Sequence, residues 1–235
     1  MTSKSSKPAK IAAVLAALML VGVGCASQGP TDDPIQRKLQ WFSYLEGGDF
    51  RARCGPGAPD RYRLVYNGVY LEQVRAYDLY ADGDLEVRVT EETDLTNFTI
   101  SSVRDLLKPW RGETTSMPLT SGEMNTLIDA LTRDGAFGPP AVGTELSSKG
   151  FFWTIASCHD GDYHFTGLAW PSDAWGMATF DDVLFALDPS HVPVNPPRNT
   201  ETTRFVRQRD RSQNDNAFRV RVGENGLAGT FTIPH

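Results

Sequence analysis

The stretch FFWTIASCHDGDYHFTGLAW, residues 151–170, predicts a β-hairpin. Two runs rich in aromatic and aliphatic residues flank Asp160 and Gly161, and an Asp-Gly pair is a strong signal for a two-residue turn between antiparallel strands. With this turn, Cys158 lies opposite Tyr163. Residues that alternate along a strand share one face of the sheet. The face that we expect to point into the core carries Phe151, Trp153, Ile155, Thr166, Leu168 and Trp170.

A second block of alternating residues, 61–90, predicts three more antiparallel strands arranged as a meander. In its last strand, residues 84–90, aliphatic side chains alternate with polar ones, which is typical of a strand with one face in water. The two predicted turns lie at dipeptides that favour tight reversals of the chain, Asn67-Gly68 and Asp82-Gly83.

The clearest predicted helix covers residues 119–135. Thr120 and Glu123 have the spacing of a capping box, in which each side chain binds the backbone N–H of the other residue. Shorter helices are expected over 35–45 and 179–187. The sequence therefore predicts an α+β fold, an antiparallel sheet of hairpins packed by one or two amphipathic helices.

The chain begins with a positively charged segment, an apolar core and small residues. Lys4, Lys7 and Lys10 precede the apolar run 11–24, which ends at Cys25. This order is that of a secretory signal. The run is too short to span a bilayer as a helix, which takes about 20 residues.

Residues 20–25, LVGVGC, resemble the lipobox of bacterial lipoprotein precursors, with Gly22 at the position where leucine is usual. The resemblance covers the signal segment alone. It implies cleavage before Cys25, thioether lipidation of that cysteine, acylation of the new amino terminus, and a membrane contact made through this lipid. Ala26 and Ser27 replace the early aspartate that is associated with inner-membrane retention. This favours the outer membrane, with the protein facing the periplasm.

The composition changes sharply after the second hairpin, where prolines are followed by an almost wholly polar stretch. Such a stretch is typical of an exposed linker. The predicted segments are a signal peptide (1–24), a tether (25–34), an α+β domain (35–190), a Pro/Arg-rich linker (191–216) and a C-terminal hairpin (217–235).

The cysteines fit a protein that is exported to an oxidising compartment. The chain has three of them, and lipidation of Cys25 leaves Cys54 and Cys158 as an even pair. Export favours a disulfide between these two. The bond would also leave neither thiol free to act as a nucleophile.

The charge of the chain argues against a nucleic-acid partner. Loss of the three lysines in the signal leaves 20 basic and 29 acidic side chains, a net charge of −9. Residues 198–222 run against this trend, with seven arginines and three acids. Arginine suits phosphate and carboxylate groups. The side chains that we expect to contact an envelope protein, a glycan or an anionic lipid are Arg204, Arg207, Arg209, Arg211, Trp170 and Trp175.

The densest polar cluster, HDGDYH over 159–164, combines imidazole and carboxylate groups. The hairpin register places His164 on the face opposite Cys158, and a flat hairpin tip seldom brings three metal ligands together. We therefore interpret it as a polar turn, and expect neither a metal nor a cofactor.

No sequence pattern identifies a catalytic residue, because the serine-elbow, zinc-protease and phosphate-loop motifs do not occur. The function expected from the sequence is that of an envelope-anchored lipoprotein with a non-enzymatic binding or structural role. The alternative is a hydrolase that cleaves cell-wall or surface glycan with a pair of carboxylates.

Overall fold

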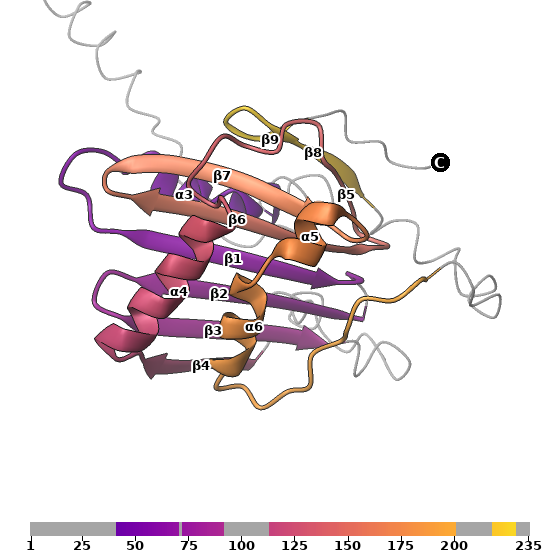
Figure 1. Ribbon diagram of the computed structural model, residues 1–235, viewed down its shortest axis with the longest axis horizontal. Coiled ribbons are helices and arrows are strands. Elements are labelled where there is room, and N and C mark those ends of the chain that lie inside the picture. Colours follow the sequence, from indigo (N-terminus) through magenta and orange to yellow (C-terminus); the bar gives the residue numbers. More distant parts are fainter. Residues whose placement is uncertain (1–40, 71, 92–112, 201–217, 229–235) are drawn as a thin grey trace, which may run out of the picture. The chain divides into compact units, whose positions relative to one another are not determined.

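The computed structural model describes residues 41–70, 72–91, 113–200 and 218–228 (Figure 1). Strands make up 39% of these residues and helices 23%, so the fold is mostly β and the predicted α+β class is wrong. Local patterns found most strands and helices, but the helices are short. Of the helices with described bounds, α4 (Ser121–Arg133) is the longest, and the others are α3 (Gly48–Arg51), α5 (Asp173–Met177) and α6 (Phe180–Ala186).

The main sheet has six strands in the order β4-β3-β2-β1-β6-β7, and every neighbouring pair is antiparallel. The first four strands form a meander, and the β6–β7 hairpin joins it beside β1. The strands are β1 (Arg61–Gly68), β2 (Gln73–Tyr80), β3 (Asp84–Glu91), β4 (Glu113–Pro118), β6 (Phe151–His159) and β7 (Asp162–Ala169).

The β6–β7 hairpin has the predicted turn and register. Cys158 pairs with Tyr163, and the two turn residues Asp160 and Gly161 have φ values of 53° and 82°. Two consecutive positive φ values are what a type I′ turn requires, and Asp-Gly adopts them readily. The sequence prediction for this hairpin is confirmed.

The predicted turn at Asn67-Gly68 is wrong, because both residues belong to β1. Asn67 is fully buried, and its amide donates hydrogen bonds to the carbonyl oxygens of Ser148, at 3.4 Å, and Gly150, at 2.7 Å. These bonds to a distant loop hold Asn67 in an extended strand. The chain reverses after it, at Val69, whose φ is 63°.

One face of the main sheet is covered by α4 and α6 (Figure 1). The predicted capping box begins α4: the Thr120 backbone N–H donates to Glu123 at 2.8 Å, and the Glu123 N–H donates to the Thr120 hydroxyl at 3.3 Å. The expected core face of the second hairpin packs beneath these helices. Its buried members include Trp153, Ile155 and Leu168, and the helices contribute Leu127, Leu131, Phe180 and Leu184.

The opposite face of the sheet is also covered, which the sequence patterns did not indicate. Residues 41–45 and α3 pack against it, and so does a second sheet in the order β5-β8-β9. In this sheet β5 (Glu145–Ser147) pairs with β8 (Arg219–Gly223), which forms a hairpin with β9 (Gly226–Ala228). The hairpin expected near the C-terminus therefore pairs with β5 and lies outside the main sheet. The second apolar cluster includes Trp41, Phe42, Leu45, Val65, Phe152, Phe218 and Val220.

Because both faces are covered, charged residues of β1 and β2 are buried and must be paired. On the second face, Arg63 donates to Asp78 at 2.9 Å and contacts Asp49 at 2.6 Å, while its guanidinium lies 3.8 Å from the centre of the Tyr44 ring. Burial raises the pKa of Asp49, but the hydrogen bond and charge of Arg63 outweigh burial and lower that pKa below its ordinary value.

On the helix-covered face, Arg75 is completely buried and binds residues 188–198, which we call the strap. Its guanidinium lies 2.5 Å from the Asp188 carboxylate and donates to the carbonyl oxygen of Val192. The Tyr77 hydroxyl donates to the same carboxylate at 2.7 Å.

The strap is held along its length by further hydrogen bonds from the sheet. Gln73 donates to the carbonyl oxygen of Pro193 at 2.9 Å, and Tyr66 donates to that of Asn195 at 2.5 Å. Arg198 pairs with Glu72. The first residues of the predicted linker are therefore fixed to the strand ends, whereas residues 201–216 lie outside the described part of the chain.

The predicted disulfide is present. Cys54 and Cys158 are bonded, with a Cα–Cα distance of 5.5 Å and 104 residues of sequence separation. The bond ties the loop before β1 to the end of β6. A cross-link between residues this far apart removes much of the conformational freedom of the unfolded chain.

We predict that reducing the disulfide lowers the free energy of unfolding by roughly 2–5 kcal/mol, the range found when native disulfides are removed. The measurement is urea denaturation with and without reductant. The double variant Cys54→Ala, Cys158→Ala should match the reduced protein and should not respond to reductant. An unchanged midpoint on reduction would contradict the prediction.

We predict that Arg75→Met costs roughly 3–5 kcal/mol, because it leaves the buried carboxylate of Asp188 without its cation. Limited proteolysis should then cut within the strap. Glu72→Gln is the control, since it weakens the exposed pair with Arg198, which is worth less than about 1 kcal/mol. Urea denaturation measures the free energy of unfolding of both variants. An equal decrease in the two would show that burial does not make the Arg75–Asp188 pair more stabilising than the exposed pair.

Candidate functional site

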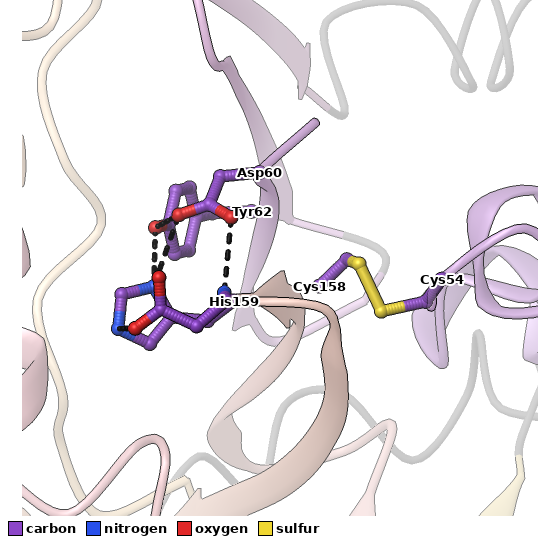
Figure 2. Close-up of a disulfide and its surroundings, with 6 residues drawn as sticks. Cys54, Asp60, Tyr62, Cys158 and His159 are labelled. Atoms are coloured by element: carbon purple, nitrogen blue, oxygen red, sulfur yellow. Dashed lines mark hydrogen bonds and ion pairs between the residues drawn. A yellow bond between two sulfur atoms is a disulfide. The ribbon is translucent and has the colours of Figure 1, made fainter. Parts of the chain in front are cut away.

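Four polar side chains meet at one end of the main sheet, where the β6–β7 hairpin turns (Figure 2). Asp60 directly precedes β1, Tyr62 lies in β1, His159 ends β6, and Asp160 is in the turn. The pairing of β1 with β6 brings residues about 100 positions apart together, as the separation between Asp60 and Asp160 shows. We call these four residues the Asp60–His159 cluster.

The Asp60 carboxylate is the centre of this cluster. One oxygen, Oδ2, accepts a hydrogen bond from the Tyr62 hydroxyl at 2.8 Å and lies 3.1 Å from His159 Nδ1. The other oxygen, Oδ1, accepts from the backbone N–H of Asp160 at 3.0 Å. Both carboxylate oxygens are therefore occupied by groups of the chain.

The hydrogen bonds determine which imidazole nitrogen of His159 carries a proton. Nδ1 lies 2.8 Å from the Tyr62 hydroxyl oxygen and 3.1 Å from the Asp60 carboxylate. Because the carboxylate can only accept, the favourable tautomer has its proton on Nδ1, which lets both Nδ1 and the Tyr62 hydroxyl donate to Asp60. Tyr62 keeps its proton and serves as a donor, because burial and then the hydrogen bond to Asp60 raise its pKa well above the ordinary value. In neutral His159 the free electron pair is then on Nε2.

Nε2 of His159 faces the carboxylate of Asp160, with 3.7 Å between Nε2 and Oδ2. This is longer than a hydrogen bond between these atoms. The Asp160 side chain is 87% exposed and that of His159 is 24% exposed. The Nε2 side of the ring therefore leads to solvent, while the Nδ1 side leads into the protein.

The imidazole of His159 is fixed in position by its neighbours. The ring of Phe137 stacks on it with 4.2 Å between ring centres and 23° between planes. The turn itself rests against the loop that follows Cys54, since a Cβ added at Gly161 would lie 2.9 Å from the carbonyl oxygen of Gly55. The disulfide lies on the other side of β6 and joins the same two segments (Figure 2).

The second histidine of the hairpin is placed near this cluster without joining it. His164 contacts the same Phe137 ring, at 5.8 Å between ring centres. Burial lowers the pKa of His164 below its ordinary value, against the opposing effect of Asp162. His164 and Cys158 lie on opposite faces of the sheet, as the predicted register required.

The two tryptophans that we expected to contact a partner are packed against the apolar cluster beneath α4 and α6. Trp170 lies edge-on to Phe151 at 6.0 Å between ring centres, and Trp175 lies 6.3 Å from Tyr66. Both side chains remain half-buried. The other predicted contact residues, Arg204, Arg207, Arg209 and Arg211, and the predicted lipidation site Cys25 lie outside the described residues.

The sequence analysis missed Asp60, Tyr62 and Phe137 as members of the cluster. Asp60 stands in a loop and has no local pattern that marks it. The signal that could have located it is the predicted disulfide, because a bond between Cys54 and Cys158 brings the loop before β1 to the hairpin turn.

Comparison with known proteins adds no family to these observations: no family model, curated protein or solved structure matches the chain. Among the described residues, no helix is both long and apolar enough to cross a membrane.

We predict that Tyr62→Phe lowers the free energy of unfolding by roughly 1.5–3 kcal/mol, because it removes a partly buried hydrogen bond to a charged group. Tyr80→Phe is the matched control at the end of the neighbouring strand, where a change away from buried contacts costs less than about 0.5 kcal/mol. Urea denaturation of both variants measures the difference. A cost for Tyr62→Phe no larger than that for the control would show that the hydroxyl does not stabilise the cluster.

Proposed function

We propose that the protein is an envelope-anchored lipoprotein whose folded domain has a non-enzymatic binding or structural role. The observation that carries this proposal is the disulfide between Cys54 and Cys158. Structural disulfides persist in oxidising compartments such as the periplasm, and they are rare in the cytosol. The bond therefore supports export, which is the step that the signal segment and the lipobox resemblance of Cys25 imply.

The way in which the described domain is built supports a role in presenting a fixed surface. Both faces of the main sheet are covered, and its buried arginines are paired with carboxylates. The carboxylates of Asp78 and Asp188 are held by these arginines, which favours a structural use of both over acid–base chemistry. A rigid domain on a tether can present a binding surface within reach of the membrane.

The partner that we propose is an envelope protein, a glycan or an anionic lipid, in contact with the arginine-rich segment that contains Arg204, Arg207, Arg209 and Arg211. The support is the local excess of positive charge in an otherwise acidic chain. Within the described residues, two arginines that continue this run, Arg219 and Arg221, are exposed and pair with Glu145. The lipid on Cys25 would place the protein at the outer membrane, facing the periplasm.

We predict that Cys25→Ser moves the protein from the membrane fraction to the soluble fraction, because stable anchoring needs the acyl chains. Cells that express either form are fractionated and probed for the protein. The double variant Cys54→Ser, Cys158→Ser is the control, since it keeps the lipidation site and should remain with the membranes. If Cys25→Ser stays in the pellet in the same proportion as the parent, lipid does not anchor the protein.

A further inference from the structure

Two atoms of the Asp60–His159 cluster that are typical metal ligands face each other. In the favoured tautomer of His159, Nε2 carries an electron pair, and it lies 3.7 Å from Oδ2 of Asp160. Zinc binds imidazole nitrogen and carboxylate oxygen at about 2.0–2.2 Å, so two of its ligands in tetrahedral geometry lie about 3.4 Å apart. The observed separation is thus close to the spacing of two atoms that share one metal ion.

The other side of the imidazole has the arrangement that metal-binding histidines use. A histidine that binds a metal donates its remaining N–H to a carboxylate or carbonyl oxygen, which fixes the tautomer and makes the ligand nitrogen more basic. Asp60 provides this carboxylate at 3.1 Å from Nδ1. Tyr62 and the backbone N–H of Asp160 hold Asp60 in place in turn.

We propose that the Asp60–His159 cluster binds a divalent first-row transition metal ion, with Zn²⁺ as the best-suited ion. His159 Nε2 and the Asp160 carboxylate are the protein ligands, and water or a further donor completes the coordination. Asp60 orients the imidazole and does not bind the ion, because both of its oxygens already accept hydrogen bonds. Asp60, His159 and Asp160 each place one polar atom within 4.8 Å of the others, and Asp60 uses its atom to hold the imidazole.

The chemistry of the donors selects this class of ion. Imidazole with carboxylate suits zinc and its neighbours, whereas calcium and magnesium prefer sites made of oxygen atoms alone. With neutral His159, the two carboxylates carry two negative charges that a divalent cation balances. This inference does not depend on the proposed anchoring, and it replaces the expectation of a metal-free polar turn, which was made without Asp60.

The disulfide and the ring of Phe137 keep this pair of ligands in place before any ion arrives. Cys158 immediately precedes His159, and its bond to Cys54 fixes the backbone from which the imidazole extends. Phe137 stacks on the imidazole face and limits its rotation. A site that is fixed in advance loses less freedom when it binds its ligand.

The test is titration of the full chain, purified in detergent with its disulfide intact and freed of metal with chelator, with ZnCl₂ in a calorimeter. We expect one equivalent to bind. Asp160→Asn and His159→Asn should each weaken binding at least tenfold, and Asp60→Asn should weaken it 10- to 100-fold, as loss of an orienting partner does. Asp160→Asn keeps the fold, because the side chain is exposed and asparagine tolerates the positive φ of this position.

His164→Asn is the matched control, since it removes the other histidine of the same hairpin and should change the affinity less than twofold. Absorption of the Co²⁺-loaded protein gives a second readout, in which the bands of bound cobalt should be lost in His159→Asn and kept in His164→Asn. The proposal is overturned if the parent protein binds no zinc below about 1 mM, a limit that lies far above the affinity of built zinc sites. It is also overturned if either ligand variant binds like the parent protein, or if the control loses binding.

Discussion

Strand β1 is hydrogen-bonded along both of its edges, to β2 and to β6, and this double pairing is the constraint that organises the domain. β2 follows β1 at once, whereas β6 arrives after the whole meander and α4. Pairing of β1 with β6 joins the two hairpin systems into one sheet and places β1 at its interior. An interior strand that is covered on both faces has no access to water, so its polar groups must find partners within the protein. The guanidinium of Arg63 and the amide nitrogen of Asn67 are paired in this way.

Features of the structure that arise from residues near one another in sequence could be predicted, and features that arise from distant contacts could not. The Asp-Gly turn and the capping box of α4 are local, because each is determined by a few consecutive residues. Asn67 shows the limit: its pair with Gly68 is typical of a turn, but bonds to the loop at Ser148 and Gly150 hold it in a strand. The fold class failed because the helices are short, so that strands make up 39% of the described residues and helices 23%. The alternation in β1 indicated one apolar face, and nothing local indicated that residues 41–45 and β8 cover the other.

The residues of the candidate site divide in the same way, into those that the local sequence indicated and those that distant contacts bring in. His159 and Asp160 were visible as a polar pair in the sequence, and their position at a hairpin tip made convergence of further ligands improbable. Asp60 changes this assessment, because it comes from the loop before β1 and binds the side chain of His159 and the backbone of Asp160. The disulfide was found by counting cysteines, and it joins the same two segments. A disulfide predicted from the sequence thus indicates which two segments lie side by side. The periodicity of hydrophobic residues cannot indicate this.

The position of β8 in the fold has a consequence for the order of events during biosynthesis. Val220 and Val222 of β8, with Phe218 just before the strand, complete the second apolar cluster, yet all six strands of the main sheet precede them in the sequence. Until they arrive, the face formed by Val65, Phe152 and neighbouring side chains lacks part of its cover. A nascent chain can form its main hairpins before β8 is made, but its uncovered apolar face must be protected from aggregation until then. The second apolar cluster can therefore close only after β8 has been made, later than the strands of the main sheet.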